Sequence, residues 1–258
     1  MLIGYEDFKK DILGLTGIDL NAYRENQMKR RIDTLISRNQ INSYQEYVAL
    51  IRNDKERYEQ FVNFLTINVS EFYRNPAQWD VLEREVFPSL IRRFGKNLKI
   101  WSAACSTGDE PYSLVMVLSK YLPLKQIKVI ATDIDRQVLE KAQIGLYNEK
   151  SIVSVPSDFK RKYFTKSGNF FQISNEIKRQ VEFSQHNLLK DPYPGGCQLI
   201  VCRNVLIYFT EDAKNTIYQK FHSALVNGGI LFIGSTEQMI DFKRLGYERK
   251  KAFFFQKG

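Results

Sequence analysis

An acidic glycine turn follows a buried apolar run near the middle of the chain. Residues 100–105 (IWSAAC) are apolar enough for a buried strand, residues 106–108 (STG) form a turn, and Asp109 and Glu110 open a helix. Strand, glycine turn and helix begin many nucleotide-binding units, because the turn lets a ligand approach the backbone. The turn contains one glycine, not the three of a dinucleotide-binding motif, so pyrophosphate binding is poorly supported. The two carboxylates suit a cation such as S-adenosylmethionine, which carries a sulfonium and an ammonium. The alternative is an ordinary Rossmann-like turn with an acidic helix start.

Polar residues that could hold an adenosine follow three further expected strands. Asp133 follows the strand at 127–132, lies 25 residues after Gly108 and could accept hydrogen bonds from both ribose hydroxyls. Asn187 follows the strand at 181–185 and offers a donor and an acceptor to an adenine edge. Arg203 and Asn204 follow the strand at 199–202. The simpler alternatives are that Asp133 caps a helix, that Asn187 is a turn residue and that Tyr208 is core packing.

The alternation of strands and helices after residue 98 positions these side chains. It predicts a doubly wound parallel sheet with its ligand site at the carboxyl ends of the strands. Further elements are expected as helices at 137–143 and 212–225, a strand at 230–233 and an antiparallel pair at 247–250 and 252–256. Residues 147–180 interrupt the pattern with two β-rich runs around Ser167-Gly168-Asn169, so we expect an inserted basic β-subdomain there.

The preceding residues divide into a small helical domain and a linker. Residues 1–67 are expected to be all-helical, residues 68–75 form the linker and residues 76–258 the second domain. The linker ends at Asn75-Pro76, a helix start with Gln78 as its capping-box partner, and Pro88 should kink that helix. The second helix is expected at 20–37, and one of its faces is basic: Arg24, Lys29, Arg30, Arg31 and Arg38.

Composition narrows the class of protein. The chain has 258 residues and a net charge of +9, which favours an acidic partner such as nucleic acid, an anionic membrane or an acidic protein surface. Residues 1–75 hold eleven basic and eleven acidic residues, so the basic helix face is a local feature there, and a merely solvated face is the alternative. Three cysteines without a Cys-x-x-Cys pair, two scattered histidines and no apolar membrane span predict a reduced cytoplasmic protein without metal.

Five strings carry a resemblance to the CheR family, the chemotaxis receptor methyltransferases that use S-adenosylmethionine. They are TINVSEFYRN at 66–75, WSAACSTGDEPYS at 101–113, TDID at 132–135, NLL at 187–189 and CRNVLIYF at 202–209. The resemblance covers nearly the whole chain. It implies a helical N-terminal domain, a Rossmann-like methyltransferase sheet of seven strands and an inserted antiparallel β-subdomain.

The resemblance also implies functional residues, a substrate and a partner. Residues implied to line the cofactor site are Asn68, Ser70, Arg74, Glu110, Asp133, Asn187, Leu188, Arg203 and Asn204. Arg74 and Tyr208 would lie near the methyl group and orient the substrate, a glutamate carboxylate on the cytoplasmic helices of chemoreceptors. Lys29, Arg30, Arg31 and Arg38 are expected to dock on those helices, with the protein acting as a monomer. Some members grip a receptor peptide through a longer glycine loop in the insert, whereas the connection at 167–169 is short here.

Two alternatives of other classes remain at this point. One is a nucleic-acid methyltransferase or a non-catalytic basic binding module, which the charge would suit. Against it, the fourth strand ends in Arg203-Asn204-Val205-Leu206, not the Pro-Pro-aromatic run of amino-methylating enzymes, and no nucleic-acid motif is recognisable. The other is a catalytically inactive receptor adaptor, against which the intact cofactor residues argue.

Overall fold

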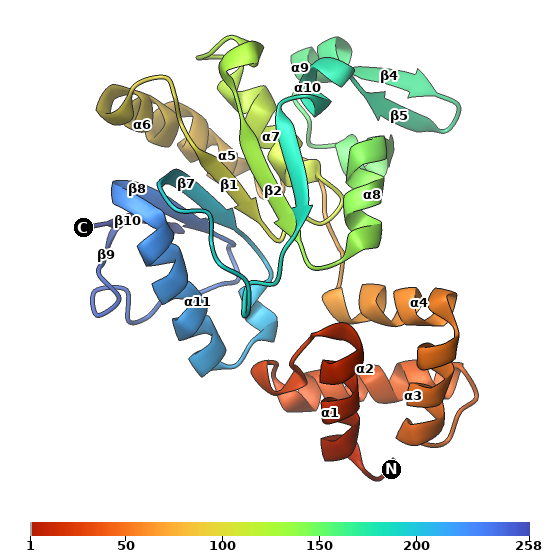
Figure 1. Ribbon diagram of the computed structural model, residues 1–258. Helices are drawn as coiled ribbons and strands as arrows, with labels where there is room; N and C mark the ends of the chain where they lie inside the picture. Colours follow the sequence, from red (N-terminus) through yellow and green to blue (C-terminus); the bar gives the residue numbers. More distant parts are fainter. Residues whose placement is uncertain (1) are drawn as a thin grey trace. The chain divides into compact units, whose positions relative to one another are not determined.

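The computed structural model describes residues 2–258, which form two compact units. The helical unit comprises the residues up to 68 together with residues 206–216. The sheet unit comprises residues 69–205 and 217–258. Figure 1 labels the elements of both, and each unit is described below by itself.

The helical unit packs four α-helices around an aromatic and aliphatic core. They are α1 (Tyr5–Thr16), α2 (Glu25–Arg38), α3 (Tyr44–Asn53) and α4 (Lys55–Thr66). Ser43 and Asp54 cap α3 and α4 by accepting hydrogen bonds from the amides of Glu46 and Arg57. Side chains of every helix meet in the core, where Phe8, Ile32, Tyr44 and Phe61 are fully buried.

The helix expected at 20–37 is interrupted. A 3₁₀ turn, η1 (Leu20–Ala22), precedes α2, and Tyr23 between them is extended. Tyr23 forms an antiparallel bridge with Phe209, next to the short helix η5 (Leu206–Tyr208). The Arg24 amide donates to Tyr208 O at 2.9 Å, and the Tyr23 and Phe209 rings lie 4.7 Å apart. This pairing with a distant segment prevents one continuous helix.

The sheet unit is built on seven strands in the order β6-β2-β1-β7-β8-β10-β9. The strands are β1 (Ile100–Ala103), β2 (Val129–Asp133), β6 (Val181–Gln185), β7 (Cys197–Cys202), β8 (Leu225–Ile233), β9 (Tyr247–Lys251) and β10 (Phe254–Lys257). The first five are parallel, and β10 and β9 add antiparallel. The predicted parallel sheet and its terminal antiparallel pair are confirmed. Gly228 and Gly229 lie inside β8.

The helices of the sheet unit precede β1 or connect its strands. They are α5 (Pro76–Val81), α6 (Phe87–Phe94), α7 (Asp109–Leu118), η3 (Leu124–Gln126), α8 (Arg136–Ile144) and α11 (Glu211–Ala224), the last of which starts within the 206–216 segment. A π-helical turn, η2 (Leu82–Val86), separates α5 from α6. It immediately precedes Pro88, whose missing N–H disrupts the α-helical ladder at the point where the sequence predicted a kink.

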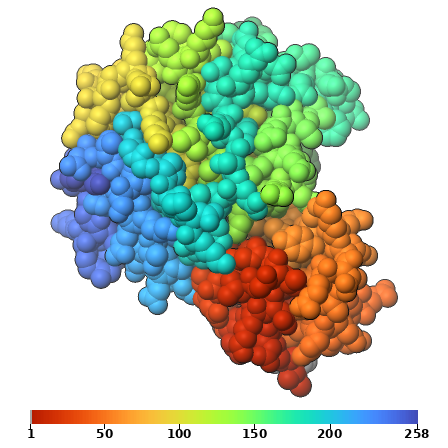
Figure 2. Space-filling model, in the orientation of Figure 1, coloured from red at the N-terminus to blue at the C-terminus, as the bar shows by residue number. Residues whose placement is uncertain are grey.

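The insert between α8 and β6 carries a second sheet. Its strands, β3 (Leu146–Asn148), β4 (Phe164–Ser167) and β5 (Phe170–Ile173), are antiparallel in the order β3-β5-β4, which confirms the predicted hairpin. Three short helices that the sequence did not reveal accompany them: η4 (Lys150–Ile152), α9 (Ser157–Tyr163) and α10 (Asn175–Lys178). Figure 2 shows the surface of the insert in green to teal. Across residues 2–258, no helix has both the length and the apolarity to cross a membrane.

Candidate active site

The turn after β1 has an unusual backbone. Ala104, Ser106 and Gly108 all have positive φ angles, of 63°, 50° and 86°. A Cβ on Gly108 would lie 2.8 Å from the Ala142 Cβ of α8, so this position requires glycine. Two non-glycine residues in the left-handed region are costly, and such conformations concentrate at ligand sites.

Asp133 ends β2 directly beside this turn. Its side chain is buried, with Oδ2 accepting from the Ser106 amide at 2.8 Å and Oδ1 from the Asp135 amide at 3.0 Å. Burial raises the pKa of Asp133 to about 6. Asp135, not Asp133, caps α8 by accepting from the Gln137 amide. A carboxylate has about four acceptor positions, so Asp133 can still accept hydrogen bonds from ribose hydroxyls.

A buried ion pair joins the start of α7 to the end of β7. Glu110 Oε1 accepts from the Ser102 hydroxyl at 2.8 Å, and its Oε2 lies 3.6 Å from Arg203 Nη1. Burial raises the pKa of Glu110 and lowers that of Arg203. The Arg203 guanidinium also lies 4.7 Å from the centre of the Phe232 ring. Both charges are thus held inside the protein with partners on each side.

Arg203 also fixes the segment that carries Arg74. Its Nη2 donates to Arg74 O at 2.6 Å and to Gln78 Oε1 at 2.8 Å. Trp79 Nε1 donates to the same Arg74 carbonyl at 3.0 Å. Gln78 is therefore not the expected capping-box partner, and the Asn75 side chain makes no cap hydrogen bond. The Arg74 side chain is half-buried, and its Nη1 donates to Val69 O at 3.1 Å.

Asp109 anchors the other end of the same segment. It accepts hydrogen bonds from the Thr107 hydroxyl at 2.6 Å and from the Ser70 hydroxyl. Burial raises its pKa to about 6. The Tyr73 amide donates to Ser113 Oγ, and that hydroxyl donates to Asp109 O. Residues 70–74 are consequently held along the start of α7.

Asn187 and Leu188 follow β6. Asn187 Oδ1 accepts from the Leu189 amide at 2.9 Å, and the Asn187 amide donates to Asp191 Oδ2 at 2.7 Å. These bonds define an Asx turn, so the simpler interpretation of Asn187 as a turn residue is confirmed. Leu188 is buried. Contact of either residue with an adenine stays a prediction.

The turns after β7 and β8 are joined by a residue that the sequence did not single out. Glu237 is 4% exposed, and it accepts hydrogen bonds from the Val205 amide at 3.0 Å and the Gly234 amide at 2.6 Å. A lone glutamate in a loop carries no sequence signal for such a role. Asn204, in the turn after β7, has a φ of 61° and donates from Nδ2 to Thr236 Oγ1 in the turn after β8.

Two expected site residues belong to the helical unit. Asn68 donates from Nδ2 to the Thr66 hydroxyl at 2.8 Å. Tyr208 lies in η5, where its carbonyl pairs with the Arg24 amide. Ser70, Arg74, Glu110, Asp133, Asn187, Leu188, Arg203 and Asn204 belong to the sheet unit.

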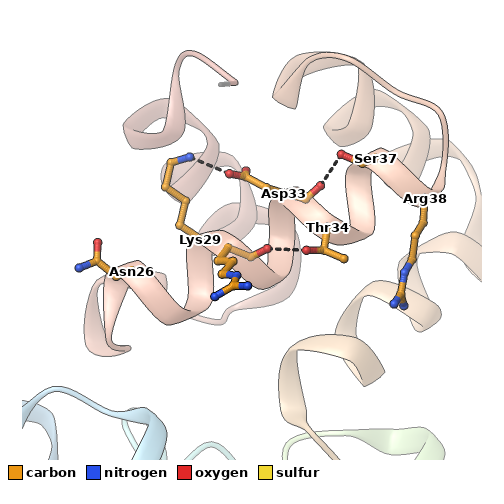
Figure 3. Close-up of a pocket in the computed structure, with 7 residues that line it drawn as sticks. Asn26, Lys29, Asp33, Thr34, Ser37 and Arg38 are labelled. Atoms are coloured by element: carbon orange, nitrogen blue, oxygen red, sulfur yellow. Dashed lines mark hydrogen bonds and ion pairs between the residues drawn. The ribbon is translucent and has the colours of Figure 1, made fainter.

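The helical unit also contains an open cleft along α2, of about 610 Å³ (Figure 3). Residues of one helix face line it: Asn26, Lys29, Arg30, Asp33, Thr34, Ser37 and Arg38. Lys29 is paired with Asp33 at 2.8 Å, whereas Arg30 and Arg38 are exposed, and within residues 2–258 neither has an acidic partner.

Arg31 does not line this cleft. Its Nη2 donates to Phe64 O at 2.7 Å, and its guanidinium lies 4.6 Å from the centre of the Phe64 ring. Partial burial lowers the pKa of Arg31. The grouping of Arg31 with the exposed cations is therefore corrected, because its side chain packs between α2 and α4.

The carboxyl edge of the sheet fits a polar cationic ligand. Among the buried side-chain atoms that lack a hydrogen-bond partner within residues 2–258, four lie at this edge: Ser106 Oγ, Asp109 Oδ1, Arg203 Nε and Asn204 Oδ1. Unpaired buried polar atoms are rare, and these four lie in the segments that follow the adjacent strands β1 and β7. The buried carboxylates there outnumber the single buried guanidinium of Arg203. This balance suits a sulfonium and an ammonium better than a phosphate.

Comparison with known proteins agrees with this geometry. A family model described as "CheR methyltransferase, SAM binding domain" matches residues 68–252, and one described as "CheR methyltransferase, all-alpha domain" matches residues 3–66. A "Chemotaxis protein methyltransferase" of Listeria innocua is 39% identical over 97% of this chain and 98% of its own length. "Chemotaxis protein methyltransferase 2" of Vibrio cholerae is 33% identical over 87% of this chain and 81% of its own.

The matches span both units and every motif discussed above. They do not favour the nucleic-acid methyltransferase or the non-catalytic module. The sheet of seven strands, the helical N-terminal domain and the antiparallel insert are those that the sequence predicted. The chain belongs to the CheR family of S-adenosylmethionine-dependent chemotaxis methyltransferases.

Proposed function

We propose that this chain transfers a methyl group from S-adenosylmethionine to glutamate side chains of chemoreceptors, in the cytoplasm. The products are a glutamate methyl ester and S-adenosylhomocysteine. The observation that supports this best is the network around Arg203, which joins the acidic edge of the sheet to the Arg74 segment. The guanidinium that pairs with Glu110 also holds the Arg74 backbone carbonyl, which supports a role for Arg74 beside the acidic edge.

The residues of the sheet edge divide the work of holding the cofactor. Asp133 would accept hydrogen bonds from the ribose, and Glu110 would face the cationic methionine end or the sugar. Asn187 and Leu188 would contact the adenine. Asn68 and Ser70 would also line the cofactor site.

The reaction requires little acid–base chemistry from the protein. S-adenosylmethionine supplies an intrinsically activated methyl group. A glutamate carboxylate is ionised at neutral pH, since its reference pKa is about 4.3, and needs no general base. One carboxylate oxygen forms the new O–CH₃ bond while the S–CH₃ bond breaks, and the electron pair of that bond remains on sulfur.

Arg74 and Tyr208 would orient the substrate. The planar fork of Arg74 can hold a carboxylate in one plane, and the Tyr208 hydroxyl can donate one hydrogen bond. Opposite charges cancel during transfer, so a cation bound tightly to the carboxylate would stabilise the ground state more than the transition state. Their contribution is alignment, which can lower the barrier by up to about 7–11 kcal/mol.

The receptor would bind through the α2 cleft. Arg30 and Arg38 are exposed, and neither forms an ion pair with an acidic residue within residues 2–258. Both guanidinium groups could therefore pair with acidic side chains on a receptor helix.

Methyl transfer to receptor-containing membranes tests this proposal. With tritiated S-adenosylmethionine, we expect label in the receptor band and its release as methanol by mild base, as glutamate methyl esters require. Receptors whose candidate glutamates are replaced by alanine are the matched control. Base-stable label, or label in added RNA rather than receptor, would contradict it.

A further inference from the structure

Glu237 uses both carboxylate oxygens on backbone amides of two different turns. Oε1 accepts from Val205, just after β7, and Oε2 accepts from Gly234, just after β8. The residue is 4% exposed. A buried carboxylate is costly unless its hydrogen bonds are complete, and here they join the ends of two adjacent parallel strands.

The two turns approach each other more closely than side chains would allow. A Cβ on Gly234 would lie 2.7 Å from the Asn204 amide nitrogen and 2.9 Å from Glu237 Oε2. Asn204 has a φ of 61°, a conformation that a non-glycine residue keeps only where its surroundings hold it. Thr236 provides a second contact between the two turns, because its hydroxyl accepts a hydrogen bond from Asn204 Nδ2 at 3.2 Å.

A change at Glu237 would act first on Asn204, because Asn204 precedes Val205 and its amide nitrogen faces Gly234. Its Oδ1 is buried and has no partner within residues 2–258, and its neighbour Arg203 carries the contacts to Glu110 and Arg74. The Glu237 carboxylate also acts on Arg203 electrostatically and raises the pKa of that guanidinium, against the larger effect of burial.

We propose that Glu237 is a positioning residue for methyl transfer, which holds the Arg203–Asn204 turn in its cofactor-binding conformation. The inference rests on the proposed cofactor site. Glu237 does not touch the reacting atoms in this account and acts through Asn204.

The variant Glu237→Gln tests whether both carboxylate oxygens are needed, and it changes the size of the side chain little. A glutamine offers one acceptor oxygen and presents an NH₂ group to the second amide, so one of the two turns is released. We expect the Kd for S-adenosylhomocysteine, measured by calorimetry, to rise about tenfold, the effect of one charge-assisted hydrogen bond. The KM for S-adenosylmethionine should rise similarly, and kcat at saturating cofactor should fall by less. Glu248→Gln on the exposed edge strand β9 is the control.

A double-mutant cycle separates positioning from general loss of structure. If Glu237 acts through Asn204, the Kd of the Glu237→Gln/Asn204→Ala double variant should be close to that of Asn204→Ala alone. The proposal is wrong if the increase in Kd of the double variant equals the product of the increases of the two single variants. An unchanged Kd in a folded Glu237→Gln would also overturn it.

Hydrogen exchange on the wild-type protein covers the case in which the variant does not fold. S-adenosylhomocysteine should slow exchange of the Val205 and Gly234 amides together, and exchange that is unaffected would overturn the inference. The proposed function fails separately, if the wild type binds S-adenosylhomocysteine but does not methylate receptor.

Discussion

Single buried carboxylates at the strand ends bind the protein's own backbone as well as any ligand. Asp133 illustrates this, since its oxygens accept from the Ser106 and Asp135 amides and its side chain is almost fully buried. The sequence predicted an acid facing a ribose. The structure adds that the same acid fixes the turn after β1, and its contact with a ribose stays a prediction.

Cofactor affinity should therefore fall as pH is lowered through about 6. Burial raises the pKa of Asp133 to about 6, and protonation removes an acceptor that the ribose needs. In calorimetry between pH 5 and 8, Asp133→Asn should bind S-adenosylhomocysteine more weakly and lose most of this pH dependence. Asp109 has the same raised pKa, so a residual slope belongs to it. A variant with the wild-type profile would contradict the assignment.

Stability should respond to pH in the opposite sense. A carboxyl whose folded pKa lies above its unfolded value of 3.8 stabilises the fold below that value, and the contribution is lost as pH rises through about 6.

Arg74 and Tyr208 make distinguishable predictions at saturating cofactor. Arg74→Ala should cut turnover strongly in a folded protein, because the oriented fork is lost. Tyr208→Phe removes one hydroxyl and should cost less, about 1–2 kcal/mol of transition-state stabilisation. The measurement is kcat with receptor substrate. If Arg74→Ala regains the wild-type kcat at saturating S-adenosylmethionine, Arg74 binds the cofactor and does not orient the substrate. Tyr208 would then be the one candidate left beside the carboxylate.

At the scale of elements, the exposed Arg30 and Arg38 of α2 line the cleft, whereas Arg31 packs on Phe64 of α4. Charge reversal at Arg30 and Arg38 should raise the KM for receptor at low salt, and less so at high salt, because exposed charges are screened. Arg52→Glu is a matched control, being an exposed arginine of α3 in the same unit. Equal effects of both changes, or none at low salt, would mean that the cleft face of α2 is only solvated.

Local patterns predicted the elements that depend on local sequence. The alternation after residue 98 predicted the strands of the sheet, and two β-rich runs predicted the hairpin of the insert. The failures involve distant partners. Tyr23 is extended and pairs with Phe209 instead of continuing a helix. Gln78 accepts a hydrogen bond from Arg203, 125 residues away, and does not cap α5. Arg31 packs on Phe64, which no helical period reveals.

The same distinction applies to the site. The sequence predicted that Glu110, Asp133 and Arg203 share one edge, because they follow strands of a parallel sheet whose carboxyl ends lie together. Their contact with the cofactor stays a prediction. Glu237 depends on which two turns meet and on the space left by Gly234. That information exists only once the strands are paired.

At the scale of the whole molecule, residues 206–216 belong to the helical unit although 137 residues of the sheet unit, 69–205, precede them. A fragment of residues 1–68 should therefore unfold at lower urea concentration than the same unit in the whole chain. It lacks the buried Leu206 and Phe209, each worth about 1.5–3 kcal/mol, and the hydrogen bond from the Arg24 amide.

Adding a synthetic 206–216 peptide should raise the urea midpoint of that fragment, and a peptide with Phe209→Ser should do so less. Helix signals of the fragment and of the whole chain, followed by circular dichroism, provide the measurement. A fragment as stable as the unit in the intact chain would show that the returning segment contributes little.

The returning segment, residues 206–216, also bears on biosynthesis. The four helices of α1 to α4 leave the ribosome before the sheet unit, yet the strand bridge at Tyr23 has no partner until Phe209 has been made. The helical unit is thus completed only after β1, β2, β6 and β7 have emerged. A nascent chain stalled before residue 206 would expose the surface around Tyr23, which gives chaperones a site that disappears when translation passes the RNVLIYF string.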